Sequence, residues 1–419
     1  MRDIINEIVV SMSRNKLRTA LTGFAVAWGI FMLIFLLGAG NGLINAQVNN
    51  TKGYLANSMV VYGGFTSMPY DGLESGRRVN LTDRDIDVTG RGFTENIDMV
   101  GAVISQGGQT VTFGKEYVNV TIDGVYPGNI LINKREMLVG RFINDMDMSE
   151  RRKVMVISEE HAKELVPRAP HTLAGKYVRC GGLVYRIVGI YKSDAMWHST
   201  SAFVPFTTLR TIYDKGSSAG NIEFSFHGLA TQADNECFED AYKARLNKLH
   251  RAAPEDNSAI WIGNRYTSNM QMNNGISMMR TALWIVGLLT LLSGVVGVSN
   301  IMLITVKERR REFGIRKAIG ATPWQILRLI IVESVVVTTF FGYIGMVCGV
   351  AANEILNATI GNMVIDTGIF KMLVFLDPTV GLDVCVEATL VMIAAGTVAG
   401  LIPARKAARI RPIEALRAE

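Results

Sequence analysis

Charged side chains gather in one short stretch of this chain, where they could form ion pairs or bind a charged partner. The stretch covers residues 307–322 and reads KERRREFGIRKAIGAT. It lies between two apolar runs, of which residues 281–306 carry no charge and residues 329–352 carry one, Glu333. Each run is long enough for a helix that crosses a bilayer, which needs about 20 apolar residues. A basic segment between two such helices is typical of a cytoplasmic loop.

Residue patterns for catalysis or metal binding are absent from the sequence. The phosphate-binding motif G-x-x-x-x-G-K-[ST] does not occur, because Gly175 and Lys176 lack the upstream glycine and are followed by tyrosine. Neither H-E-x-x-H nor a paired-cysteine metal spacing is present. Residues 197–199 (Trp-His-Ser) place a histidine beside a serine, but such a pair alone does not indicate catalysis. Residues 159–161 (Glu-Glu-His) are expected on the solvated face of a surface helix.

The charged stretch has the features of a short helix. Glu312 precedes Arg316 by four residues, which is the favourable order for an ion pair on a helix. One side of this helix is expected to be apolar: Phe313, Ile315, Ala318 and Ile319. Gly320 is placed to end the helix, since glycine accepts the left-handed conformation there. Thr322 and Gln325 then form a capping box for the next helix.

A rigid charged helix between two spans has two interpretations. It can be a docking surface for a cytoplasmic partner. It can also be an anchor at the membrane interface, whose basic side chains extend toward water. The residues alone leave both interpretations open.

Composition predicts a membrane protein with a polar domain. Hydrophobic residues make up 49% of the 419 residues and charged residues 19%. The predicted spans are residues 19–43, 276–306 with an outward stalk, 323–352 and 382–402. The fold class is therefore four transmembrane α-helices, with an α+β extracytoplasmic domain, residues 44–275, inserted between spans 1 and 2.

The distribution of lysine and arginine predicts the orientation. Residues 1–18 hold 4 of these residues, residues 307–328 hold 7 and residues 403–419 hold 5, whereas the external loop 353–381 holds one. Basic residues favour the cytoplasmic side, so both termini are expected there and the inserted domain outside. Because the basic residues lie beside apolar runs, the net charge of +6 indicates contact with membrane lipid and not with nucleic acid.

The first 18 residues are expected to form an amphipathic helix on the inner leaflet. The alternative is the basic flank of a secretory signal peptide. No charge occurs between Arg18 and Lys52, a run far longer than the apolar core of a signal peptide, which favours an uncleaved span.

The inserted domain shows strand and helix patterns. Val118, Val120 and Ile122 alternate as in a half-buried strand. Thr82 with Asp85 resembles a capping box, and residues 236–249 repeat apolar side chains at helical spacing. Cys180 and Cys237 have no spacing that supports a disulfide, so two unpaired thiols are expected, although pairing is left open.

Two acidic residues fall within the predicted spans. Glu333 lies a few turns from the cytoplasmic end of the third span, and Glu387 lies near the outer end of the fourth. An ionisable residue within a span is a candidate for function. At the position of Glu333, a buried hydrogen bond to a neighbouring helix is the favoured interpretation, and a role in transport is the alternative.

The motifs resemble a known family. The stretch NIMLITVKERRREFGIRKAIGATPWQI, which starts at Asn300, is similar to the signature loop of the MacB/FtsX-like ABC transporter permeases. The segments VMVISEEHAKEL (from Val154), VYRIVGIY (from Val184) and PARKAARIRPIEALRAE (from Pro403) are similar to other parts of the same family. In that family the loop helix couples the membrane domain to a cytoplasmic ATPase. The resemblance also implies that the extracytoplasmic domain has two subdomains, one made from both ends of the insert and one inserted in its middle.

The resemblance implies which residues take part in coupling to the ATPase. They are Glu308, Arg311, Glu312, Phe313, Gly314, Arg316, Lys317 and Gly320. The charged residues are expected to form ion pairs, Phe313 an apolar plug, and the glycines tight backbone turns.

The resemblance also implies partners. A separate ATPase would bind ATP and magnesium, no cofactor would bind this chain, and a second permease copy would complete a homodimer or heterodimer. Export of a small molecule or peptide, through a periplasmic adaptor and an outer-membrane channel, is the expected function. The alternatives within the family are lipoprotein release and regulation of a cell-wall hydrolase. An ATPase-independent membrane-anchored sensor domain is the alternative outside it.

Overall fold

The computed structural model describes residues 16–50, 53–193, 201–366 and 371–408, so the expected N-terminal amphipathic helix, residues 197–199 and most of the basic tail lie outside the description. The described residues belong to two compact units. We call residues 1–47, 275–364 and 373–419 the helical unit, and residues 48–274 and 365–372 the mixed unit.

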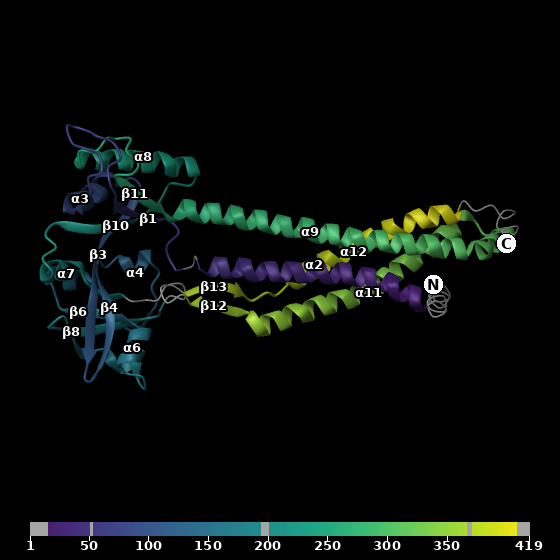
Figure 1. Ribbon diagram of the computed structural model, residues 1–419, viewed down its shortest axis with the longest axis horizontal. Helices are drawn as coiled ribbons and strands as arrows, with labels where there is room; N and C mark the ends of the chain where they lie inside the picture. Colours follow the sequence, from purple (N-terminus) through teal and green to yellow (C-terminus); the bar gives the residue numbers. More distant parts are fainter. Residues whose placement is uncertain (1–15, 51–52, 194–200, 367–370, 409–419) are drawn as a thin grey trace. The chain divides into compact units, whose positions relative to one another are not determined.

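Four long helices, one of which begins in the mixed unit, are apolar and long enough to cross a membrane in the described part of the chain. They are α2 (Lys16–Asn50), α9 (Arg265–Glu308), α11 (Pro323–Ile360) and α12 (Leu382–Ala408). The short helix α10 (Arg310–Ala318) connects α9 to α11 (Figure 1). Helix α11 continues eight residues beyond the expected position 352, because residues 353–360 contain no glycine or proline.

Small residues let the helices approach closely. A Cβ atom on Gly345 of α11 would lie 2.3 Å from the carbonyl oxygen of Ala27 in α2. One on Gly294 of α9 would lie 2.8 Å from the carbonyl oxygen of Ala25. Such contacts, where only glycine fits, are typical of helix packing within membranes.

The mixed unit is built on one sheet of eleven strands. The strands are β1 (Ser58–Gly63), β2 (Leu81–Thr82), β3 (Ile97–Phe113), β4 (Glu116–Val125), β5 (Met137–Gly140), β6 (Val154–Ser158), β7 (Tyr177–Cys180), β8 (Leu183–Tyr191), β9 (Ser201–Pro205), β10 (Ser218–Phe226) and β11 (Ile260–Asn264). Their main order is β11-β1-β10-β3-β4-β9-β6-β8-β5, with β2 beside β10 and β7 beside both β3 and β8. The 17-residue strand β3 joins the part made from both ends of the unit to the part made from its middle.

Helices cover this sheet. They are α3 (Asp83–Gly92), α4 (Asn129–Ile132), α5 (Asp145–Ser149), α6 (Glu159–Leu165), the 3-10 helix η1 (Pro170–Leu173), α7 (Phe206–Ile212) and α8 (Gln232–Leu249). Helix α8 begins four residues earlier than expected, because Thr231 and Asp234 form its capping box. A separate hairpin, β12 (Asn362–Asp366) and β13 (Lys371–Leu376), occupies part of the expected external loop.

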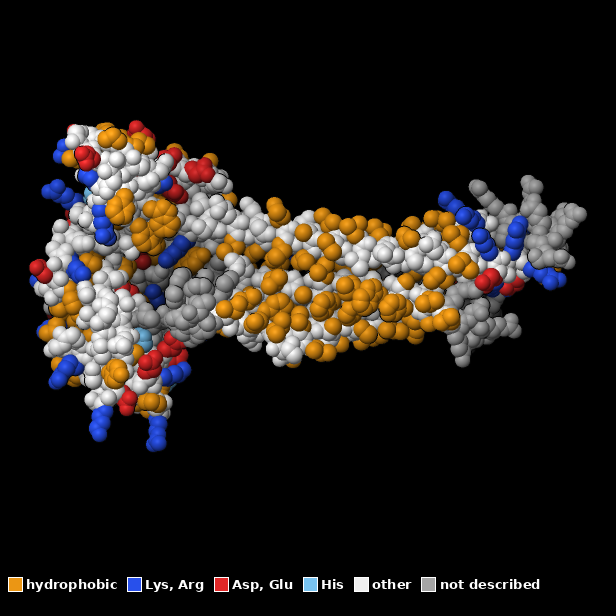
Figure 2. Space-filling model, viewed as in Figure 1, with side chains coloured by type: hydrophobic (Ala, Val, Ile, Leu, Met, Phe, Trp, Pro, Cys, Tyr) orange, Lys and Arg blue, Asp and Glu red, His pale blue; other side chains and the backbone are white. Residues whose placement is uncertain are grey.

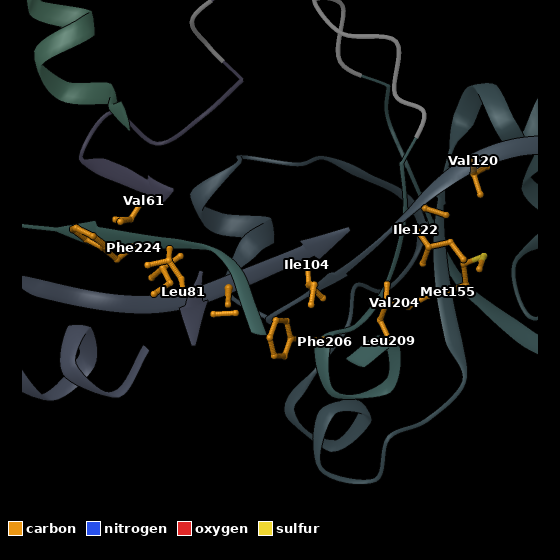
Figure 3. Packing of buried hydrophobic residues seen from close by; sticks show 14 of the residues in the cluster. Val61, Leu81, Ile104, Val120, Ile122, Met155, Val204, Phe206, Leu209 and Phe224 are labelled. Carbon is orange, nitrogen blue, oxygen red and sulfur yellow. The ribbon is translucent and has the colours of Figure 1, made fainter. Parts of the chain in front are cut away.

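The alternation predicted for β4 is confirmed. Val118, Val120 and Ile122 are buried in the main core, which runs through both parts of the sheet (Figure 3). Asp85 accepts a hydrogen bond from the backbone N–H of Thr82 at 2.7 Å, as a capping box requires. Cys180 and Cys237 are both free thiols.

His161 corrects an expectation. It does not lie on a solvated face, because its side chain is only 5% exposed and its residue packs with the core side of α6. Burial lowers the pKa of the His161 imidazole to about 4, and the nearby Glu160 opposes this shift.

Candidate functional site

The candidate site is α10 and the two sharp turns that join it to α9 and α11. Helix α9 ends at Glu308, Arg309 breaks the helical path, and α10 begins at Arg310. At the other end, Gly320 has a φ of +105°, a conformation that glycine adopts easily. The side chain of Thr322 then accepts a hydrogen bond from the backbone N–H of Gln325 at 3.4 Å, which confirms the predicted capping box.

Arg309 is the centre of an ion-pair network at this junction. Its Nε and Nη2 atoms donate to the two oxygens of Glu312, at 2.8 and 3.0 Å. Its Nη1 donates to Oε2 of Glu333 in α11, at 3.3 Å. Arg316 adds a contact to Glu312, with Nη2 2.9 Å from Oε1, which confirms the predicted pair. One guanidinium therefore connects α10 to α11.

The network changes the acidity of Glu312. Hydrogen bonds from Arg309, followed by the charges of Arg309 and Arg316, hold the pKa of this carboxyl below its usual value, although partial burial opposes the shift. Glu312 is therefore ionised over a wider pH range than an isolated glutamate.

The sequence pattern predicted Glu312 and Glu333 but missed Arg309. A signal was available, because Arg309 precedes Glu312 by three residues, a spacing that places two side chains together on a helix. The lone carboxylate of Glu333 in an apolar run also required a nearby cation or donor. The favoured interpretation of Glu333 is a buried hydrogen bond to a neighbouring helix. Glu333 is buried and hydrogen-bonded, but its partner Arg309 lies between α9 and α10 and not within a helix.

The predicted apolar side of α10 is wrong, because its residues point in different directions. Phe313 is 1% exposed and belongs to the core of the helical unit, with the Arg309 guanidinium carbon 5.3 Å from its ring centre. Ile315 and Ile319 are instead 42% and 82% exposed. The reason is geometric, since residues two apart on a helix point about 200° apart. Trp324, at the start of α11, is also 69% exposed.

The remaining predicted residues differ in their surroundings. Gly314 is buried within α10, so the tight turn expected at this glycine is wrong, whereas Gly320 does form one. Lys317 donates from Nζ to the carbonyl oxygen of Ala408 at 2.5 Å, at the end of α12. Glu308 and Arg311 are exposed. The contact of Lys317 joins α10 to the end of α12, which is distant in the sequence.

Glu387 is exposed and lies apart from this site. It is 21 residues from the end of α12, which corresponds to about 30 Å along a helix. Figure 2 shows hydrophobic side chains along the long helices of the helical unit and charged side chains gathered at the end that holds α10.

A second polar network holds the first residue of α9 within the mixed unit. Arg265 donates from Nη1 to Oγ of Ser58 and to the carbonyl oxygen of Ile132, both at 3.2 Å. Its Nη2 donates to Oδ1 of Asn133 at 2.9 Å. Side chains of β1, the end of α4 and α9 therefore meet at one guanidinium.

Glu223 of β10 extends this network into the sheet. It is 3% exposed and accepts hydrogen bonds from Asn129 at 2.7 Å and from Asn133 at 3.1 Å. Burial raises the pKa of Glu223, while the two asparagines and the nearby Arg265 oppose this shift. Sequence patterns gave no sign of this network, because its members are far apart in the chain.

Family models match most of the chain. Residues 19–248 match the model described as MacB-like periplasmic core domain. Residues 284–412 match the model described as FtsX-like permease C-terminal.

Individual relatives are similar along nearly the whole chain. The uncharacterized ABC transporter permease YknZ of Bacillus subtilis (strain 168) is 26% identical over 422 residues, covering 98% of this chain and 97% of that protein. Macrolide export ATP-binding/permease proteins MacB of Shewanella sp. (strain W3-18-1) and Chlorobaculum tepidum are 26% and 27% identical. Each of these two comparisons covers 98% of this chain, which spans 60% of the length of those MacB proteins.

Two solved structures are partly similar. The periplasmic region of MacB from Actinobacillus actinomycetemcomitans has a TM-score of 0.43 and 18% identity, covering 53% of this chain and 95% of that one. The extracellular domain of the ABC-type transporter YknZ has a TM-score of 0.41 and 18% identity, covering 50% of this chain and 100% of that one.

Proposed function

Because this chain belongs to the MacB-like and FtsX-like family of ABC transporter permeases, we propose that it couples ATP hydrolysis in a cytoplasmic ATPase to movement of its periplasmic domain. The four apolar helices and the family together indicate a membrane protein with a periplasmic domain. Both termini and α10 lie in the cytoplasm, and the membrane is the cell inner membrane. The cargo is a small molecule or peptide that is exported.

The observation that supports this proposal is the continuity of α9. It is a single helix of 44 residues, with Arg265 as its first residue and Arg309 directly after its last. Arg265 is held by the network in the mixed unit, and Arg309 by the carboxylates of Glu312 and Glu333. A force applied at α10 therefore has a stiff, anchored path to the periplasmic domain.

The exposed surface formed by α10, the turn after it and the start of α11 supplies the docking contact. Ile315, Ile319 and Trp324 are apolar and exposed, and the basic residues of the segment surround them in the sequence. An ATPase surface with an apolar depression and acidic side chains would bury them. Glu312, Arg316 and Gly320 then act by positioning this surface, since their contacts and conformation shape the junction.

The partners follow from the same mechanism. The ATPase binds ATP and magnesium, a role that the match to the FtsX-like permease family supports. A second permease copy completes the transporter, and a periplasmic adaptor and an outer-membrane channel continue the export route. The match to a MacB-like periplasmic core domain favours export over hydrolase regulation.

Ile319→Asp tests the docking contact in proteoliposomes that contain the permease and its ATPase. Because Ile319 is 82% exposed, the variant is expected to fold but to lose about tenfold or more in ATP-driven transport. Leu131→Asp is the control, since Leu131 is 58% exposed on the mixed unit and is expected to transport normally. Full transport activity in Ile319→Asp would contradict the proposal.

A further inference from the structure

One face of the sheet in the mixed unit is covered and the other is partly bare. The main core covers one face with residues such as Val111, Val118 and Tyr185, and α6 contributes Ala162 and Leu165 to that core. On the opposite face, a second cluster covers only the strands toward β5: Val125, Phe142, Ile143, Val156, Tyr191 and Phe203. Val125 is at the end of β4 and Tyr191 is at the end of β8. The same face of β7, of residues 110–113 of β3, of residues 116–121 of β4 and of residues 183–187 of β8 lies outside that cluster.

The strand registers place a continuous row of side chains on this bare face. Tyr117 of β4 pairs with Thr112 of β3, which pairs with Arg179 of β7, which pairs with Val184 of β8. The alternate residues Val111, Val118, Cys180 and Tyr185 are buried, so the row points away from the core.

A neighbouring row adds Tyr177 of β7 and Arg186 of β8, which pair directly. We call these six residues the basic sheet face: Thr112, Tyr117, Tyr177, Arg179, Val184 and Arg186. Its largest side chains are open to solvent, with Tyr117 67% and Tyr177 64% exposed. Val184, which lies beside the turn between β7 and β8, is 50% exposed.

The charge of this face is one-sided. Arg179 and Arg186 are exposed, and neither forms an ion pair within the residues that the structure describes. By contrast, Arg141, Arg210 and Arg251 each contact an aspartate.

Acidic residues are missing from the outward positions of residues 110–113, 116–121, 177–180 and 183–187. Asp123, which has the same alternation as Tyr117, lies six residues further along β4 and accepts a hydrogen bond from Ser105. The outward residues beside the two rows are Thr110 and Asn119, which hydrogen-bond to each other at 2.9 Å. Glu116 is adjacent to Tyr117 in the sequence, but it lies on the other face of the sheet, as does its partner Phe113. The basic sheet face therefore has a positive charge that the strand residues directly beside it do not neutralise.

We propose that the basic sheet face binds an acidic segment of a protein partner outside the cytoplasm. Arginine and tyrosine are the residue types that contribute most to protein interfaces, and a guanidinium binds a carboxylate with two parallel hydrogen bonds. A second copy of this face is disfavoured because its charge has the same sign. A membrane surface is disfavoured too, since lipid-binding patches usually need four or more basic residues together.

A labelled peptide of alternating glutamate and tyrosine tests this inference, using the full chain in nanodiscs of zwitterionic lipid. We expect it to bind the native chain, whereas the same peptide with glutamine for glutamate does not. Arg179→Glu/Arg186→Glu is expected to weaken binding about tenfold or more. Arg91→Glu, which changes an exposed arginine at the end of α3, is the control and should bind as the native chain does. Fluorescence anisotropy gives each affinity.

Three outcomes would overturn the inference. The first is equal binding of the peptide by the native chain and Arg179→Glu/Arg186→Glu. The second is equal binding of the glutamine peptide. The third is that the native chain binds phosphatidylglycerol vesicles more strongly than the peptide, and that Arg179→Glu/Arg186→Glu weakens the vesicle binding. This result would assign the basic sheet face to lipid. If Arg179→Glu/Arg186→Glu fails to fold, as judged by circular dichroism, Tyr117→Ala replaces it with the same expected direction.

Discussion

At the scale of single residues, the main finding is that one arginine balances two carboxylates. Arg309 is 18% exposed in its side chain and contacts both Glu312 and Glu333. A carboxylate such as that of Glu333, whose side chain is 10% exposed, is costly to bury unless a cation or donor compensates it. The contact thus explains why an acidic residue is tolerated near the end of an apolar helix.

Arg309→Met is expected to destabilise the helical unit by about 3–5 kcal/mol, because it leaves Glu333 without its guanidinium partner. Arg309→Met/Glu333→Met should recover most of this loss, since both charges are then removed. Unfolding in mixed detergent micelles measures the difference. If the double variant were as unstable as the single one, the ion pair would not be the cause.

His161 makes the stability of the mixed unit depend on pH. Its pKa is about 4 in the folded chain, whereas an unfolded histidine titrates near 6.5. Between these values the unfolded state binds more protons, so the free energy of unfolding falls as the pH drops from 6.5 to 4, by about 3 kcal/mol at most. In His161→Leu this part of the pH dependence should disappear, as denaturant titrations at several pH values would show. An unchanged slope would contradict the burial of the imidazole.

At the scale of elements, α9 connects two polar networks that are made in different ways. The network around Arg309 is mostly local in sequence, since Arg309, Glu312 and Arg316 are within eight residues of one another. The network around Arg265 brings together residues from β1, β10 and the end of α4. The first therefore shapes a turn, and the second fixes the root of a helix in a sheet.

Arg265→Lys tests whether the contacts of Arg265, the first residue of α9, are needed to transmit force to the mixed unit. Lysine keeps the charge but cannot donate to Ser58, Ile132 and Asn133 at once, because it lacks the planar fork of the guanidinium. We expect ATP hydrolysis by the partner to continue while transport falls about tenfold. Arg245→Lys, on α8, is the matched control. Equal losses of hydrolysis and transport would indicate a general folding defect instead.

At the scale of the whole molecule, the proposed mechanism requires the two units to be exposed in different compartments. The mixed unit contains Cys237, an exposed free thiol, and α10 is followed by the exposed Ile319. These positions offer a direct comparison of the two sides of the membrane.

A thiol reagent that cannot cross membranes should label a chain with Cys237 as its sole cysteine in intact spheroplasts. A second chain has its four native cysteines replaced by serine and carries Ile319→Cys. It should be labelled only after lysis. Mass spectrometry identifies the labelled residue. Labelling of both chains without lysis would place the mixed unit and α10 in the same compartment and contradict the proposed mechanism.

Local patterns in the sequence were sufficient to predict the main helices and part of the candidate site. The apolar runs, the capping boxes at Thr82 and Thr322, and the stop at Gly320 depend on neighbouring residues, and the structure agrees with each. The pair of Glu312 and Arg316 was also predictable, because four residues on a helix fix their separation.

What the sequence by itself determined is therefore the identity of the helices and the charged segment, since both follow from periodicity and composition. Only the tertiary structure decided that Phe313 faces inward while Ile319 faces out, and that Glu223 accepts a hydrogen bond from Asn129 near the charge of Arg265. The direction of a side chain depends on which neighbouring element buries it. That information lies in contacts between distant parts of the chain, which no local pattern contains.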